Sequence, residues 1–225
     1  MLRKTEKGKL ADNYGSGSRE NYLPWIRVGE FGSAGTSACC VDWKTGRTVH
    51  CLSQAEEMAW YLLRWDDENL DIREQYPLDL DETLAIADEL GLAHPAVKGI
   101  PKTMTTDFLV TRADHEIAIS VKSSESQIKK SRRAIEKLYI EREYWRRKNI
   151  SFKLLTRDRM NMDMFLNIRN VIPFYEADIL TDDISIAKHL IAQHLIDADM
   201  THPLNLPEIV IKERKVIDLW KTHSK

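Results

Sequence analysis

A carboxylate and an amine lie in two short runs of strand-forming residues that can bring them together. Residues 105–111 (TTDFLVT) and 116–122 (EIAISVK) are rich in Val, Ile, Thr and Phe and flank a short polar turn, a pattern typical of a β-hairpin. In a suitable register this hairpin brings Asp107 close to Ser120 and Lys122 at the strand ends. A carboxylate facing an amine there is one arrangement for binding a metal ion and activating a nucleophile. The alternative is an edge hairpin whose charges are solvated or paired.

A second candidate carboxylate stands at the start of a helix. The run 53–56 (SQAE) fits the capping box, with Ser53 as the N-cap and Glu56 three residues later. At 100° per residue Glu56 also falls inside an apolar arc, whereas Glu57 faces the polar side. Capping explains an acidic residue on the buried side, and a metal site is the other explanation. The two roles compete, because a carboxylate bonded to its own helix start is less free to bind an ion.

The composition excludes several classes of protein. Hydrophobic residues make up 43% and charged residues 30% of 225, which is enough for a core and favours a soluble chain. No apolar run reaches the roughly 18 residues of a membrane span, so no membrane partner is expected, and the polar start lacks the core of a signal peptide. Cys39, Cys40 and Cys51 show no paired-ligand spacing, which predicts a reducing cytoplasm.

Charge is segregated along the chain although the net charge is only −2. Residues 52–100 hold 12 acidic and 3 basic side chains, and residues 122–159 hold 13 basic and 5 acidic ones. Such segregation can create one positive surface suited to a phosphate backbone. A solvated basic helix gives the same count, so the charges alone leave both interpretations open.

Strand and helix signals mix between residues 39 and 156 and predict an α/β core. Strands are expected at 39–43, 47–52, 71–77, 105–111, 116–122 and 150–156, and helices from residue 53, at 81–90 and at 127–148. The last of these helices is the longest and the most basic. Its candidate DNA contacts are Lys129, Lys130, Arg132 and Arg133.

The composition divides the chain into three parts. Residues 1–20 are polar and contain Gly and Ser, which predicts a flexible N-terminus. Residues 21–158 form the α/β domain, and residues 159–225 a small, mostly helical C-terminal module for partner interaction. In this module helical segments are expected at 184–198, behind a cap at Thr181 or Asp182, and at 208–223. Docking on a partner and structural capping of the core are the two readings of this module.

The order of several motifs closely resembles the TnsA-type transposon endonucleases, the nuclease subunits of heteromeric cut-and-paste transposases. The matching pieces span about residues 20–156 and are YLPWIRV, KTGR, HCLSQAEE, LDIREQYPL, IADELGLAHPAV, MTTDFLV, IAISVK and IEKLYIEREYWRRKNI. Each is weak alone, and their shared order makes the resemblance specific.

The resemblance implies a restriction-endonuclease-like mixed sheet flanked by helices. It also implies that Glu56, Asp107 and Lys122 are the catalytic set and that Mg²⁺, with Mn²⁺ as a substitute, is the cofactor. The implied metal ligands are Glu56, Asp107 and position 120 with the carbonyl of Val121. Family members usually carry Gln at position 120, and this chain carries Ser120. Glu141 matches a further family glutamate near the site.

The resemblance further implies a reaction and partners. A bacterial, cytoplasmic endonuclease would hydrolyse the 5′ strand at transposon-end DNA, while a DDE-type partner transposase cuts and joins the 3′ ends and an AAA+ ATPase acts as regulator. A catalytically weak or inactive assembly subunit that bridges transposase and regulator is the alternative. A stand-alone nuclease is disfavoured, because nothing in the chain resembles a sequence-reading module.

Overall fold

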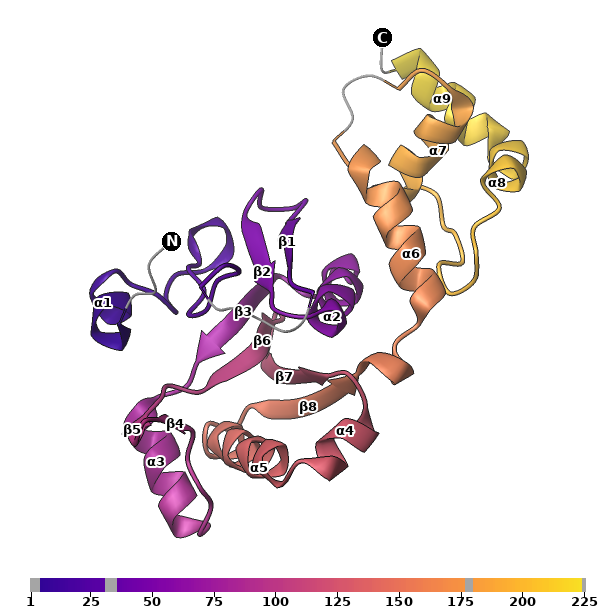
Figure 1. Ribbon diagram of the computed structural model, residues 1–225. Helices are drawn as coiled ribbons and strands as arrows, with labels where there is room; N and C mark the ends of the chain where they lie inside the picture. The colour runs from indigo at the N-terminus through magenta and orange to yellow at the C-terminus, as the bar shows by residue number, and fades with distance from the viewer. Residues whose placement is uncertain (1–4, 31–35, 177–179, 224–225) are drawn as a thin grey trace. The chain divides into compact units, whose positions relative to one another are not determined.

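Two units of the chain, Met1–Met160 and Asn161–Lys225, each enclose buried residues of their own in the computed structural model (Figure 1). The structure describes residues 5–30, 36–176 and 180–223. The sequence predicts a boundary after residue 158, and the observed division falls after residue 160. No helix within the described ranges is long and apolar enough to cross a membrane.

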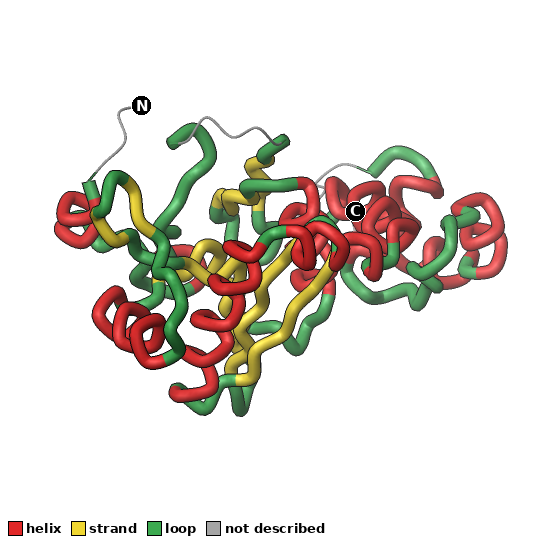
Figure 2. Tube along the Cα trace, turned by 60° about the horizontal axis from the view of Figure 1, so that its bottom comes forward, coloured by secondary structure: helices red, strands yellow, loops and turns green. Residues whose placement is uncertain are grey.

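A four-stranded mixed sheet forms the centre of the first unit. Its strands are β3 (Asp71–Pro77), β6 (Thr105–Thr111), β7 (Glu116–Lys122) and β8 (Ser151–Thr156), in the order β3-β6-β7-β8. β3, β6 and β7 are antiparallel, whereas β8 is parallel to β7. A parallel pair needs a long crossover, and two helices between β7 and β8 provide it. Figure 2 shows these strands side by side in yellow. The predicted mixed sheet flanked by helices is confirmed.

Helices and two small hairpins surround this sheet. The α-helices are α1 (Glu6–Ala11), α2 (Gln54–Trp65), α3 (Leu80–Glu89), α4 (Glu125–Lys130) and α5 (Arg132–Arg147), with 3₁₀ turns η1 (Arg19–Asn21) and η2 (Arg157–Arg159). The hairpins are β1 (Ala38–Val41) with β2 (Thr48–Cys51), and β4 (Ala96–Val97) with β5 (Ile100–Pro101). β1 and β2 match the strands expected at 39–43 and 47–52, whereas β4 and β5 are not among the strands expected from the sequence.

The hairpin that carries Asp107 lies inside the sheet, which corrects the edge-hairpin alternative. β6 is paired on both sides, and so is β7. Ile119 of β7 packs in one core with Trp60 of α2. On the opposite face, Ala118 packs with Ile140 of α5. Both faces of the hairpin are therefore covered, and Asp107 and Lys122 form an ion pair of 3.1 Å whose side chains are 16% and 33% exposed.

The single helix predicted over residues 127–148 is two helices. α4 ends at Lys130 and α5 begins at Arg132, with Ser131 between them. The Ser131 hydroxyl accepts a hydrogen bond from the amide of Ala134 at 3.2 Å, so Ser131 is the N-cap of α5. Ser favours this position over a helix interior because its side chain satisfies a free backbone N–H.

The N-terminal segment has more structure than its composition indicates. Within the described part of residues 1–20, Thr5 caps α1 and the side chain of Lys9 is buried. The Lys9 ammonium donates to the carbonyl of Trp25 and to the carboxylate of Glu30. A buried lysine is stable only with such acceptors. These contacts join α1 to residues 25–30 of the first unit.

The second unit is helical in its described residues. Its elements are α6 (Met162–Val171), η3 (Ile172–Phe174), α7 (Asp183–Ala192), α8 (Leu206–Lys212) and α9 (Arg214–His223). Asp182 is the N-cap of α7, and the helix ends at Ala192 rather than at residue 198. The segment predicted at 208–223 is two helices that meet at Glu213.

Candidate active site

Asp107 sits where β6 and β7 separate. The antiparallel pairing of these strands ends at Phe108 and Ile119. Beyond that pair, the Asp107 carboxylate takes the place of the missing ladder bonds. Its Oδ2 accepts from the amide of Val121 at 2.6 Å and from the Ser120 hydroxyl at 3.3 Å. The sequence prediction that a hairpin brings Asp107 to Ser120 and Lys122 matches this geometry.

The ammonium of Lys122 lies among three oxygen atoms. It is 3.1 Å from Asp107 Oδ2, 2.8 Å from Ser120 Oγ and 2.8 Å from the carbonyl oxygen of Val121. Burial alone lowers the pKa of Lys122, but the negative charges of Asp107 and Glu141 outweigh burial, and the pKa is raised. Lys122 is therefore a cation at neutral pH. The oxygen atoms that hold it belong to Asp107, Ser120 and Val121, which the family resemblance implies as metal ligands.

Glu56 lies in the first turn of α2 and is 8% exposed. Its Oε2 accepts from the amide of Leu52 at 2.9 Å, and its Oε1 accepts from the Ser53 hydroxyl at 2.9 Å. Ser53 also caps the amide of Glu56 at 3.2 Å. The predicted N-cap is thus present, but the Glu56 carboxylate reaches the amide before Ser53 instead of that of Ser53 itself. Burial and the charge of Asp107 raise the pKa of Glu56 to about 7.

Gln75 links Glu56 to the sheet, and the sequence analysis missed it. Its Nε2 donates to Glu56 Oε2 at 3.1 Å, and its Oε1 accepts from the Thr105 hydroxyl at 3.1 Å. Gln75 has a positive φ of 48°, and it stands between the β3 residues that pair with Phe108 and Thr106. The left-handed backbone therefore occurs opposite Asp107. No local sequence signal marks such a position, because Gln does not favour it.

Glu141 extends from α5 into the same region. Its side chain is buried, and its Oε1 has no hydrogen-bond partner among the described residues. Burial raises the pKa of Glu141 to about 7; the Lys122 cation opposes this shift, and the Asp107 charge adds to it. A buried carboxyl with an unmet oxygen is costly unless it is protonated or meets a cation. Glu141, which the family resemblance placed near the site, therefore lies in the group around Asp107.

A cleft of about 930 Å³ opens onto this group. Asp107, Lys122 and Glu141 line it, and Glu56 does not. Of the four predicted DNA contacts, Arg133 alone is in the lining, while Lys129, Lys130 and Arg132 are exposed outside it. The other basic side chains that line the cleft are Lys9, Lys102 and Lys137.

Lys137 is a cleft residue that helical periodicity could have identified. It precedes Glu141 by four positions on α5, so the two lie on one helix face. Partial desolvation and the positive charges of Arg133 and Lys122 lower the pKa of Lys137, although the residue is exposed. Among the described residues Lys137 forms no ion pair. This cation is available to an anion that enters the cleft.

The oxygen atoms around Lys122 fit a divalent cation. Mg²⁺ prefers oxygen ligands, and Asp107, Ser120 and the carbonyl of Val121 offer only oxygens. Asp107 Oδ1 accepts no hydrogen bond from any residue in the described ranges. Those ranges hold no cluster of three or more His, Cys, Asp or Glu side chains suited to a metal. A cation here would therefore depend on main-chain and hydroxyl oxygens as well as on carboxylates.

Two buried ion pairs of the first unit have structural roles. Arg47 forms two hydrogen bonds of 2.7 Å with the buried carboxylate of Glu74, which ties the β1–β2 hairpin to β3. Arg64 of α2 donates to Asp42 at 2.7 Å, and both side chains are buried. Breaking such a pair leaves an uncompensated buried charge, which costs about 3–5 kcal/mol. These charges maintain the fold rather than line the cleft.

A mixed sheet flanked by helices, with an acid and a lysine where two strands separate, defines the restriction-endonuclease-like class. Residues 66–157 match the family described as TnsA-like endonuclease N terminal. This match places residues 66–157 in the TnsA-like endonuclease family. Asp107, Lys122 and Glu141 lie within the matched span, and Glu56 precedes it.

The chain is also 37% identical over 156 residues to the transposon Tn7 transposition protein TnsA of Escherichia coli. This similarity covers 68% of the chain and 56% of that protein. The chain thus matches somewhat more than half of its relative's length.

Proposed function

We propose that this protein is a Mg²⁺-dependent DNA endonuclease that hydrolyses the 5′ strand at transposon ends. The observation that carries the proposal is the contact of Asp107 with Lys122 at a cleft lined by further basic side chains. The match of residues 66–157 to the TnsA-like endonuclease family supports a phosphodiester as the substrate. Mn²⁺ is the expected substitute for Mg²⁺, since both prefer oxygen ligands.

Asp107, Glu56 and the carbonyl of Val121 would hold the cation, with Ser120 beside them. A bound divalent cation lowers the pKa of its water and offsets charge on the phosphate. Lys122 would share these oxygens with the cation. Its ammonium, 3.1 Å from Asp107 Oδ2, would orient the attacking water or neutralise charge on the phosphate.

The cleft cations have a separate role in this mechanism. Phosphodiester hydrolysis passes through a state with extra negative charge on the phosphate, and fixed positive groups stabilise it. Lys137 and Arg133 line the cleft with Lys122. They would hold the DNA backbone so that the scissile phosphate lies against Asp107. The negative charge of Glu141 would raise the pKa of Lys122 and so keep this lysine protonated.

The proposed partners follow from the family. A DDE-type transposase would cut and join the 3′ strands, and an AAA+ ATPase would regulate the complex in the bacterial cytoplasm. The relative's printed description as a Tn7 transposition protein supports a role in transposition. The second unit, residues 159–225 by sequence, is the proposed interaction module.

Strand-specific mapping of nicks tests the proposal. Transposon-end duplexes labelled on either strand are incubated with the protein, the partner transposase and Mg²⁺. We expect cuts on the 5′ strand from the wild-type protein and none from Asp107→Asn, with transposase binding retained. If Asp107→Asn cut at the wild-type rate, Asp107 would not be a metal ligand.

One observation favours the alternative of an assembly subunit without catalysis. Both oxygens of Glu56 are engaged by protein donors, namely Leu52, Ser53 and Gln75. If Glu56 never leaves these donors, the cation loses a carboxylate ligand. The mapping experiment separates the two proposals, because an assembly subunit leaves the 5′ strand intact under every metal condition while it still joins transposase and regulator.

A further inference from the structure

We propose that the β4–β5 hairpin is a wedge that enters the minor groove of the duplex held in the cleft. This inference rests on the proposed function, because it takes DNA as the occupant of the cleft. The hairpin spans residues 96–101, with Ala96 opposite Pro101 and Val97 opposite Ile100. The family resemblance and the cationic lining explain the cleft, but they assign nothing to this hairpin.

Its apolar side chains are exposed to solvent. Val97 is 51% and Ile100 is 62% exposed, and the two are directly paired across the hairpin. An exposed apolar pair on a two-residue ribbon contributes little to the core, which lies elsewhere. Apolar side chains of this kind insert between base steps in proteins that kink DNA from the minor groove.

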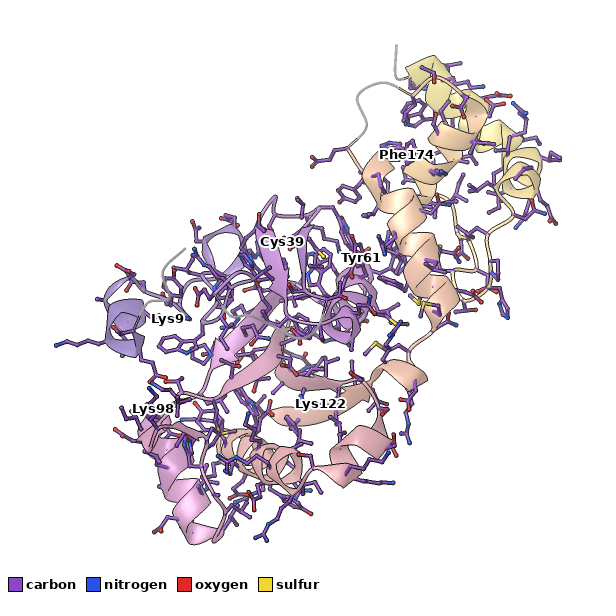
Figure 3. All side chains as sticks on the ribbon, in the orientation of Figure 1. Lys9, Cys39, Tyr61, Lys98, Lys122 and Phe174 are labelled. Carbon is purple, nitrogen blue, oxygen red and sulfur yellow. The ribbon has the colours of Figure 1, made fainter. Side chains whose placement is uncertain are left out.

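The turn of the hairpin holds a lysine in an unfavourable backbone conformation. Lys98 has a φ of 52° and Gly99 a φ of 75°. Two-residue turns with both φ values positive favour Asn, Asp or Gly at the first position. A lysine there places a positive charge at the tip at some conformational cost. Lys98 is labelled in Figure 3 at the periphery of the first unit.

The base of the hairpin is braced by α5 and α3. Arg133 of α5 donates to the carbonyls of Ala93 and His94, the latter at 2.7 Å. The His94 ring lies 3.1 Å from the Thr83 hydroxyl on α3. A wedge needs a rigid support, because bending DNA costs several kcal/mol. A mobile loop would move aside instead of bending the duplex. Arg133 therefore serves the hairpin as well as the cleft.

The return strand is braced in the same way. The amide of Lys102 donates to the carbonyl of Pro95 at 2.9 Å, which closes the base of the hairpin. The amide of Thr103 donates to the Glu6 carboxylate of α1 at 3.2 Å. Three helices thus hold the hairpin while its tip stays exposed.

The position and charge of the hairpin select DNA as its occupant. Val97 and Lys102 line the same cleft as Asp107 and Lys122, so a backbone held at Asp107 passes the hairpin. Residues 96–102 (AVKGIPK) contain two lysines and no acid. This charge complements phosphates on both sides of a groove, and the apolar pair between them suits base edges and sugars.

The test measures binding of the full chain to two fluorescent duplexes in Ca²⁺, which holds DNA without cutting. One is an intact 30-base-pair duplex, and the other has the same sequence with a central unpaired base that makes bending easy. For Val97→Ser with Ile100→Ser, we expect roughly tenfold weaker binding to the intact duplex and nearly wild-type binding to the bulged duplex. The salt slope should not change, because apolar contacts release no counterions.

Two further variants sharpen the result. Lys98→Gln should weaken binding to both duplexes and reduce the salt slope by about one unit. Val41→Ser is the matched control, because Val41 is 65% exposed on the other hairpin and outside the cleft lining; it should bind both duplexes like the wild type. Equal binding of wild type and the double variant to the intact duplex would overturn the wedge. Absence of DNA binding by the wild type would instead overturn the proposed function.

Discussion

Gln75 occupies a buried backbone position that normally favours glycine. Its φ is 48° and its side chain is 2% exposed. We expect Gln75→Gly to be about 1 kcal/mol more stable than Gln75→Ala, because a Cβ is strained in the left-handed region. Urea unfolding of both variants measures the difference. Arg73 has no positive φ, so there the Ala variant should be more stable than the Gly variant. If the Ala variant were also the more stable one at Gln75, the backbone at Gln75 would not be strained.

The two roles of Glu56 separate in one substitution. Glu56→Gln keeps an oxygen that can accept from Leu52 or Ser53, so the melting temperature should change little. If Glu56 holds the cation, 5′-strand cutting should fall at least a hundredfold, because the carboxylate charge is lost. Glu57→Gln, on the same helical turn, should alter neither quantity. Normal cutting by Glu56→Gln together with a lower melting temperature would leave Glu56 with the capping role alone.

Glu141 makes stability depend on pH. Its pKa is about 7 in the folded protein, and that of an exposed Glu is about 4.3. Between these values the folded state holds a proton that the unfolded state has lost, so stability falls as pH rises. The wild-type protein should lose free energy of unfolding between pH 5 and pH 8, and in Glu141→Gln this loss should be smaller by about 2–3 kcal/mol. Urea unfolding without divalent cations measures it, and an unchanged slope would exclude Glu141 as the source.

At the scale of the element, the end of α4 and the first residue of α5 carry basic side chains outside the cleft lining. Lys129, Lys130 and Arg132 are exposed there, and Arg132 is also paired with Glu136 at 2.9 Å. If they contact phosphates, neutralising them should weaken binding to specific and random duplexes alike. The salt slope should fall by about one unit per lost contact. An unchanged slope would mean that these charges only solvate the helix.

Lys137 lies within the cleft and offers a comparison on the same element. Its pKa is lowered by desolvation and by neighbouring cations. A phosphate in the cleft would offset the repulsion between these cations. Lys137→Gln should therefore reduce both DNA affinity and the rate of 5′-strand cutting, while the triple substitution on α4 and α5 reduces affinity alone. Binding titrations and single-turnover cutting distinguish the two. If Lys137→Gln and the triple variant cut at the same rate, Lys137 would contribute to DNA affinity only, like Lys129, Lys130 and Arg132.

At the scale of the whole molecule, the second unit depends on its last two helices. Ile217 of α9 is fully buried and Val210 of α8 is 7% exposed. Deleting residues 204–225 removes both, together with α8 and α9, which pack against α7. We expect this deletion to unfold the second unit, to abolish regulator binding in a pull-down, and to leave the first unit folded. Circular dichroism should show loss of helix but a persistent melting transition.

The outcome of this deletion separates two roles of the tail. Loss of the remaining transition would mean that the first unit needs residues 204–225 to fold, as a structural cap would predict. Normal regulator binding by the truncated chain would place the docking surface in another part of the protein. The exposed apolar residues Ile211 and Leu219 are the candidate contacts, and substituting them with Ser tests docking without unfolding.

Local patterns in the sequence determined the elements around the site. The alternating residues of 105–111 and 116–122 predict the two strands, and their short turn brings Asp107 to Ser120 and Lys122. The Ser53 cap and the end of β3 at Pro77 were likewise readable, because caps and turns depend on neighbours in sequence. The capping box and the apolar arc also singled out Glu56, and the family motifs added its catalytic role and the expected reaction.

Only the tertiary structure decided which distant residues join this hairpin. It placed β6 and β7 in the middle of the sheet, since strand order depends on pairing with β3 and β8. It brought Lys9 and Lys102 to the cleft, and gave Gln75 its left-handed backbone opposite Asp107. Such positions follow from long-range packing and from the balance of burial against charge, and neither is encoded in a short window of sequence.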